Sequence, residues 1–148
     1  MIKTIPNDVF FSWVETEISD GRSVQFRLKG NSMFPLLRSG KDDVLLCPCS
    51  KEGLKPMDVV LFRYKENYLL HRIRHIEGDN LYLQGDGSVQ AKEVCTYEDV
   101  VGKVNEIVRP GGKTISVHSW RWTLASKLWV NLGVFRTILL RIASVLMR

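Results

Sequence analysis

Residues 58–76 read DVVLFRYKENYLLHRIRHI, two apolar runs on either side of a short polar stretch. The runs 58–64 and 68–76 are rich in β-branched and aromatic residues and are too short for helices, so each predicts a strand. The polar residues 65–67 between them predict a turn. This stretch therefore predicts a β-hairpin, and a hairpin needs further strands to bury its apolar face.

Four other segments have the character of strands. In SVQFRLK (residues 23–29), apolar residues alternate with polar ones, as in a half-buried strand. Apolar runs also occupy residues 43–47, 81–84 and 100–108. Short strands at close spacing, joined by polar turns, predict a mainly β fold, either a partly open antiparallel β-barrel or a coiled sheet.

Helical patterns flank this predicted β domain. Within residues 1–22, apolar residues recur at intervals of three and four behind Asn7 and Asp8, either of which can cap a helix that Gly21 ends. The β domain is expected to span residues 23–110, up to the Pro-Gly-Gly breaker. Residues 119–148 then predict one amphipathic, basic helix with a leucine-rich stripe.

The net charge of +5 is concentrated in the C-terminal part of the chain. From residue 107 onward there are seven basic residues and no acidic one, so the first 106 residues carry 14 basic and 16 acidic residues. A basic helix with three tryptophans is typical of a segment that binds an anionic membrane surface. A partner helix covering the same stripe is the alternative.

The three cysteines and the N-terminal residues exclude several classes of protein. An odd number of cysteines argues against a disulfide framework, and Cys47-Pro-Cys49 lacks the spacing of a zinc site, so we expect free thiols, no metal and no cofactor. MIKTIPNDVFF does not have the pattern of a signal peptide, and no window holds 18 uncharged apolar residues. We expect a cytoplasmic protein, peripheral at the inner membrane surface if the terminal helix binds lipid.

The segment GNSMFPLL, residues 30–37, places a serine on a bend between two predicted strands. A serine at the end of a strand commonly caps a turn. The alternative is that Ser32 is a nucleophile, which requires a base elsewhere in the chain to accept its proton.

Three histidines are candidates for that base. His71 and His75 lie two strand periods apart, so a regular strand would place them on one face together with Ile73. His118 lies in the connector before the terminal helix, where a solvated residue is expected. The sequence thus offers His71 and His75 as bases for Ser32.

Five segments resemble, in the same order, the conserved boxes of type I signal peptidases and the related self-cleaving SOS repressors. Ser-Met-Phe-Pro (residues 32–35) is similar to the Ser-Met-x-Pro box that carries their nucleophile. The others are PMDVVLF (56–62), LLHRI (69–73), YLQGDGS (82–88) and VVGKV (100–104). The membrane anchor of signal peptidases has no counterpart in the chain.

The resemblance implies a catalytic set of Ser32 as nucleophile, His71 as general base and Asp86 as the acidic partner of the histidine. Most bacterial members have a lysine where His71 stands, so the chain is similar to the endoplasmic-reticulum and archaeal type. His75 remains the competing base. Asp79 and Asp99 remain competing acids, and Lys65 is a remote candidate for a catalytic amine.

The resemblance also implies groups that position the substrate. Family members carry a serine two residues before the nucleophile, and this chain has Gly30 there. The backbone N–H of Ser32 and the amide of Asn31 are then the expected oxyanion donors. Met33 belongs to the nucleophile box, and Arg72 is expected to support the site or the fold.

These residues predict a serine endopeptidase that cuts an extended peptide bound by strand addition, with small residues beside the cut. The alternative is a peptidase-like module that binds peptide with little or no cleavage, which Gly30 and the missing anchor favour. Nucleic acid is not an expected partner, because the roughly 20 residues before Ser23 cannot hold the helix-turn-helix of the repressors.

Overall fold

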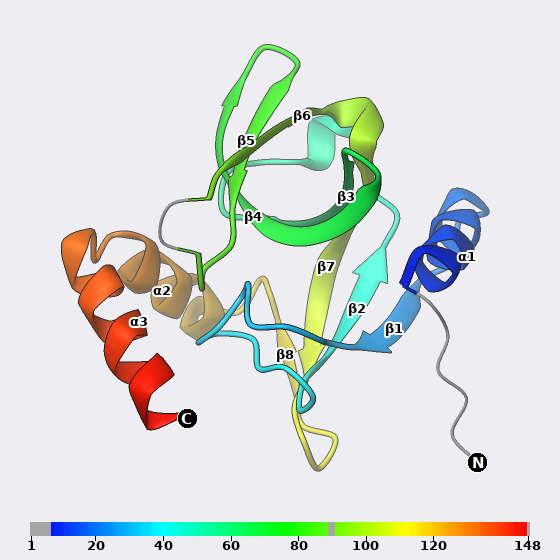
Figure 1. The fold of residues 1–148 in the computed structure, drawn as a ribbon. Coiled ribbons are helices and arrows are strands. Elements are labelled where there is room, and N and C mark those ends of the chain that lie inside the picture. Colours follow the sequence, from blue (N-terminus) through cyan, green and yellow to red (C-terminus); the bar gives the residue numbers. More distant parts are fainter. Residues whose placement is uncertain (1–6, 89–90, 148) are drawn as a thin grey trace.

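A single open antiparallel sheet forms the centre of the molecule in the computed structural model, which describes residues 7–88 and 91–147 (Figure 1). The strand order is β1-β2-β7-β3-β4-β5-β6, and β8 pairs with β7. The strands are β1 (Val24–Arg27), β2 (Asp43–Cys47), β3 (Val59–Tyr64), β4 (Asn67–Glu77), β5 (Asn80–Gln84), β6 (Glu93–Thr96), β7 (Val100–Val108) and β8 (Thr114–Ser116). The prediction of a mainly antiparallel β fold is confirmed.

The hairpin of residues 58–76 is the middle of this sheet. β3 and β4 pair from Val59↔Arg72 to Tyr64↔Asn67, so the turn lies where the polar residues predict it. The sheet is strongly coiled, because β6 contacts β3 although two strands separate them in the order. Neither β6 nor β8 was predicted, and with β8 the sheet extends beyond residue 110.

Two apolar cores form on the coiled sheet. The larger lies under α1 (Asn7–Ser19), where Val14 and Ile18 pack with strand residues such as Val44 and Ile107. The smaller lies inside the curl of β3 to β6. Each core is formed by side chains from one face of the strands, because successive residues of a strand point to opposite faces of the sheet. Alternation of apolar residues in the sequence predicts this pattern.

The C-terminal segment forms two helices instead of the single helix expected over residues 119–148. These are α2 (Trp120–Val130) and α3 (Val134–Leu146), with Gly133 between them at φ +57°, a conformation that side-chain-bearing residues rarely adopt. Ser119 caps α2 by accepting a hydrogen bond from the Trp122 N–H. The single-helix prediction is wrong because the apolar stripe continues in the sequence across this break.

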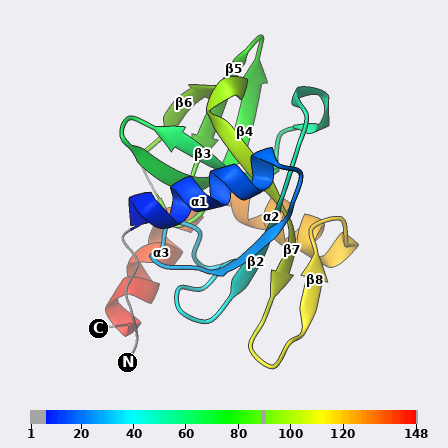
Figure 2. The same ribbon diagram turned by 90° about the vertical axis from the view of Figure 1, so that its right-hand side faces the viewer.

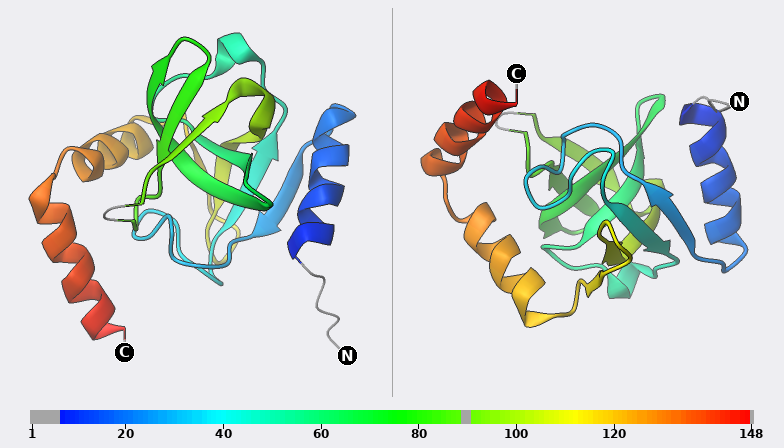
Figure 3. Two further views of the ribbon diagram at one scale, coloured as in Figure 1. Left: turned by 45° about the horizontal axis from the view of Figure 1, so that its top comes forward. Right: turned by 90° about the horizontal axis from the view of Figure 1, so that it is seen from below.

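The helices lie on opposite sides of the β structure. α1 crosses one side, and α2 and α3 follow the other (Figures 2 and 3). None of the described helices is by itself long and apolar enough to cross a membrane. Residues 120–130 and 135–146 together have the length and composition, but they meet at a bend of 99°.

Candidate active site

Residues 30–37, which include the candidate nucleophile Ser32 and are called the nucleophile segment below, follow β1 as an irregular turn. Gly30 has φ +86°, which lets the chain bend away from the strand. The Gly30 N–H donates to Ser39 Oγ at 2.8 Å, and Leu37 N–H donates to the Met33 carbonyl at 3.0 Å. These bonds hold the bend with Ser32 exposed at its apex and Met33 buried beneath it.

The Gly-Asp-Gly turn of residues 85–87 packs backbone against backbone onto this segment. The Gly87 N–H donates to the Ser32 carbonyl at 2.8 Å, and the Asp86 N–H donates to Met33 Sδ at 3.5 Å. A Cβ atom at Gly85 would lie 2.3 Å from the Ser32 carbonyl oxygen, and one at Gly87 would lie 2.1 Å from that of Asn31. Only glycine permits this approach, which explains why the turn reads Gly-Asp-Gly.

His71 lies on β4 with 6% of its surface exposed, and one ring nitrogen is paired. Its Nδ1 is hydrogen-bonded to Oε1 of Glu93, the buried first residue of β6. Because a carboxylate only accepts, Nδ1 carries a proton, and in the neutral ring Nε2 then carries the lone pair. Glu93 therefore sets the tautomer that a general base requires.

The free nitrogen of His71 faces the nucleophile segment. Its Nε2 and the Ser32 carbonyl oxygen lie 3.1 Å and 2.3 Å from the same point, the position of a Cβ atom on Gly85. Only the backbone of Gly85 therefore lies between the His71 ring and the Ser32 carbonyl. Among the described residues, Ser32 Oγ makes no hydrogen bond to His71; in substrate-free enzymes, such bonds often form only when substrate binds.

Asp86 lies in a different place from the one expected. Its two carboxylate oxygens accept from Arg72 Nε at 2.9 Å and Nη2 at 2.7 Å, and both side chains are buried. Arg72 Nη1 also donates to the Met57 carbonyl at 2.9 Å, and its guanidinium lies 5.8 Å from the Trp122 ring centre. Asp86 therefore pairs with Arg72 and fixes the Gly-Asp-Gly turn, while Glu93 occupies the role expected for it.

The competing base is directed away from the site. The strand register shifts between Ile73 and His75, and this bulge interrupts the alternation that would have placed His75 on the face of His71. The His75 side chain is 65% exposed. His118 is exposed ahead of α2.

The other competing residues also lie outside the site. Asp79 is exposed and pairs with Lys51 Nζ at 2.6 Å. Asp99 accepts from the Thr96 N–H at 3.0 Å, and Lys65 lies exposed in the β3–β4 turn. None of the three contacts His71 or Ser32 in the described part of the chain.

Backbone donors for an oxyanion are partly in use. The Gly30 N–H is bound to Ser39, so it is not available to a substrate carbonyl. The Ser32 N–H has no hydrogen-bond acceptor among the residues that the structure describes. The Asn31 side chain is exposed beside it. These two groups are the candidate oxyanion donors.

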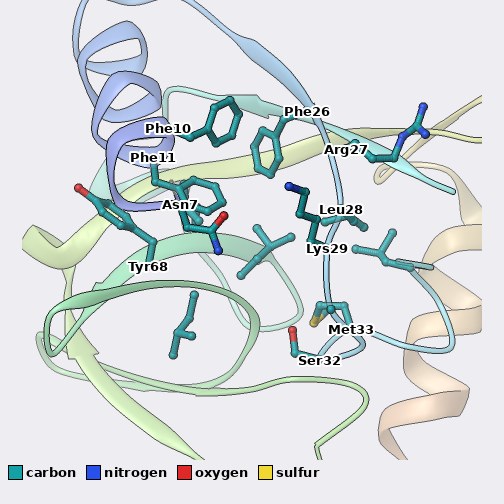
Figure 4. A pocket seen from close by; sticks show the side chains of 15 residues that line it. Asn7, Phe10, Phe11, Phe26, Arg27, Leu28, Lys29, Ser32, Met33 and Tyr68 are labelled. Atoms are coloured by element: carbon teal, nitrogen blue, oxygen red, sulfur yellow. The ribbon is translucent and has the colours of Figure 1, made fainter. Parts of the chain in front are cut away.

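An apolar pocket of about 410 Å³ opens beside Ser32. Figure 4 shows Ser32 and Met33 at one end, with Phe10 and Phe11 of α1 at the other. Further lining residues, from β1, the nucleophile segment and β4, include Phe26, Leu28, Leu37, Tyr68 and Leu70. Such walls accept large apolar side chains, which differs from the small residues expected beside the cut.

Sequence reasoning missed two residues of the candidate site, Glu93 and Trp129. Glu93 and Cys95 are both buried and share one face of β6. The sequence feature that could have identified Glu93 is its carboxylate at a buried-face position of a short alternating segment. The Trp129 indole N–H donates to the Asp86 carbonyl at 2.9 Å. No local pattern distinguishes that tryptophan from the others in the helix.

Among the described residues, no group of three or more histidine, cysteine or acidic side chains is arranged to hold a metal ion. Neither a comparison with protein-family models nor one with curated proteins finds a match for the chain.

Proposed function

We propose that this protein is a serine endopeptidase of the signal-peptidase type, on a coiled-sheet variant of that β fold. Ser32 is the nucleophile, His71 the general base and Glu93 the carboxylate that orients the base. One observation carries the proposal: a buried histidine has its Nδ1 on a buried carboxylate and its Nε2 against the loop of an exposed serine.

The chemistry follows from that arrangement. Ser32 Oγ attacks the peptide carbonyl carbon as His71 Nε2 takes its proton, and Glu93 stabilises the imidazolium that forms. The imidazolium then gives the proton to the departing amine, which leaves an acyl ester on Ser32. Water, deprotonated by the same nitrogen, hydrolyses the ester and restores the serine.

Two strand edges that are unpaired within residues 7–88 and 91–147 support binding of an extended substrate. β1 is the last strand at its end of the sheet, and it leads directly into Ser32. In β4, residues 67–71 pair with β3 alone, because pairing with β5 begins at Arg72. Both edges border the apolar pocket, so a peptide bound as an added strand places a large apolar side chain in it.

The test is cleavage of a proteome-derived peptide library by the full-length protein, read by mass spectrometry of new termini. Ser32→Ala and His71→Ala should each abolish the cuts, whereas Ser12→Ala and His75→Ala, on exposed residues outside the site, should keep them. Cuts should follow large apolar residues. Equal cleavage by all five proteins would exclude the catalytic assignment. Peptide binding without cleavage by wild type would instead identify a binding module.

A further inference from the structure

The outward face of the C-terminal helices has no partner in the described structure. Large apolar side chains on it are more than two-fifths exposed: Leu124 and Leu128 of α2, and Phe135, Ile138, Leu139, Ile142, Val145 and Leu146 of α3. The α3 residues follow the spacing of one helical face. A patch of this kind on a monomer indicates a surface that binds something.

The opposite faces of both helices pack against the β domain. Trp122 and Trp129 of α2 are buried against the domain, and Trp129 donates to the Asp86 carbonyl. Arg136 of α3 is buried and donates to the Ser88 carbonyl at 3.3 Å. The helices are therefore held in one orientation, with the apolar face of α3 directed away from the sheet.

The charges around this face select its partner. Arg121, Lys127 and Arg141 are exposed on the two helices, and no acidic residue follows Glu106 in the chain. A symmetric dimer through α3 would bring the same cations together, which opposes a second copy as the partner. An exposed tryptophan, Trp120, adds a side chain that prefers the boundary between lipid and water.

We propose that α3, with the exposed face of α2, docks on the surface of an anionic phospholipid bilayer. The apolar face enters the boundary of headgroups and acyl chains, and the arginines and lysine remain at the level of the anionic headgroups. A helix with a wide apolar face suits a bilayer, because lipids can surround it, whereas a protein partner would need a preformed groove for it. This proposal does not depend on the peptidase assignment.

The test is sedimentation of the full-length protein with vesicles of equal parts phosphatidylglycerol and phosphatidylcholine. Wild type should bind them, bind pure phosphatidylcholine at least about tenfold more weakly, and lose affinity as salt rises from ~50 to ~500 mM. The double variant Ile138→Ser/Ile142→Ser should bind roughly a hundredfold more weakly, about tenfold for each buried side chain lost. Arg121→Gln/Arg141→Gln should weaken binding to the anionic vesicles alone.

Val9→Ser is the matched control, because Val9 is an equally exposed helical residue on α1. It should bind vesicles like wild type. All variants change exposed side chains, so their melting temperatures should match that of wild type, which separates lost binding from lost folding. The proposal is overturned if wild type does not bind anionic vesicles, or if the isoleucine variant binds as well as wild type. It is also overturned if light scattering shows a protein dimer that the same variant abolishes.

Discussion

At the scale of single residues, the site depends on which carboxylate pairs with which basic side chain. Glu93 and Asp86 are both buried, but one pairs with His71 and the other with Arg72. A carboxylate on a histidine stabilises the ring when it becomes positive, whereas a carboxylate on an arginine makes a permanent, geometric link. Under the proposed mechanism the two acids therefore have different roles, Glu93 in proton transfer and Asp86 in holding the Gly-Asp-Gly turn.

Glu93→Gln should separate these roles. An amide can still hydrogen-bond the ring but does not stabilise the imidazolium, so kcat should fall by about 10² to 10⁴-fold with little change in melting temperature. The measurement is of kcat and kcat/KM on a peptide identified from the library. The control is Glu66→Gln, an exposed residue in the β3–β4 turn. Full activity in Glu93→Gln would contradict the assignment of its carboxylate.

Gly85→Ala should disrupt the contact between the two loops of the site. The new methyl group would meet the Ser32 carbonyl oxygen at 2.3 Å, and backbone on both sides has to shift. We expect a loss of about 1–3 kcal/mol in the free energy of unfolding, together with loss of cleavage. Gly53→Ala is the control, because its methyl group would meet only the Ser50 side chain, at 3.2 Å. Urea denaturation measures the free energy of unfolding of the two variants. Similar stabilities for Gly85→Ala and Gly53→Ala would count against the contact.

At the scale of elements, α2 supports the Gly-Asp-Gly turn of the candidate site. Trp122 lies over the guanidinium of Arg72, and Trp129 binds the carbonyl of Asp86, so one helix contacts both members of the buried ion pair. The helix therefore packs as part of the same unit as the β sheet, although it follows the Pro-Gly-Gly breaker in the sequence. Its outer face remains available for the proposed bilayer contact.

Trp129→Phe tests this support. The substitution keeps most of the apolar contact but leaves the buried Asp86 carbonyl without the indole donor, so the free energy of unfolding should fall by about 1–2 kcal/mol. Trp120→Phe changes a tryptophan that is 69% exposed on the same helix and should have an effect below about 0.5 kcal/mol. Thermal unfolding measures the loss of stability in Trp129→Phe and in Trp120→Phe. Equal losses would mean that the hydrogen bond to Asp86 contributes nothing.

At the scale of the whole molecule, Asp42 connects segments that are distant in sequence. It is fully buried, accepts from the Arg38 backbone N–H and side chain, and binds Arg109, which follows β7. Arg109 also donates to the Leu36 carbonyl at 3.0 Å. This cluster attaches residues 36–42, at the end of the nucleophile segment, to the C-terminal end of β7.

The cluster makes stability depend on pH. Burial by itself raises the pKa of Asp42, but hydrogen bonds from Arg38 and the charge of Arg109 outweigh it, so the pKa lies below its ordinary value of 3.8. A lowered pKa in the folded state stabilises the protein above the unfolded-state pKa, and that contribution is lost as pH falls through the folded-state value.

Asp42→Asn should therefore lower the free energy of unfolding at neutral pH by about 1–3 kcal/mol and reduce its decline toward pH ~2. Urea denaturation at a series of pH values measures the difference. Asp20→Asn, which changes an exposed carboxylate beside an exposed arginine, should follow the wild-type curve. A wild-type and an Asp42→Asn curve that stay parallel down to acid pH would show that Asp42 does not carry this dependence.

The sequence by itself determined the strands of the central hairpin, β2, β7 and helix α1. Alternating or continuous apolar residues decide these elements locally, because each strand or helix buries the face that its own periodicity creates. The nucleophile box and the Gly-Asp-Gly turn were also visible in the sequence, since both are short and have few ordinary alternatives.

Only the tertiary structure decided which acid serves His71, where the terminal helix breaks and what α2 supports. Glu93 reaches the ring because the coiled sheet carries β6 back over β3, and a pairing across 22 residues leaves no local periodicity. His75 is turned away from the site by a bulge in the pairing of β4 with β5. Periodicity specifies which face of an element is buried, but the partner of a buried polar group is fixed only when distant segments pack together.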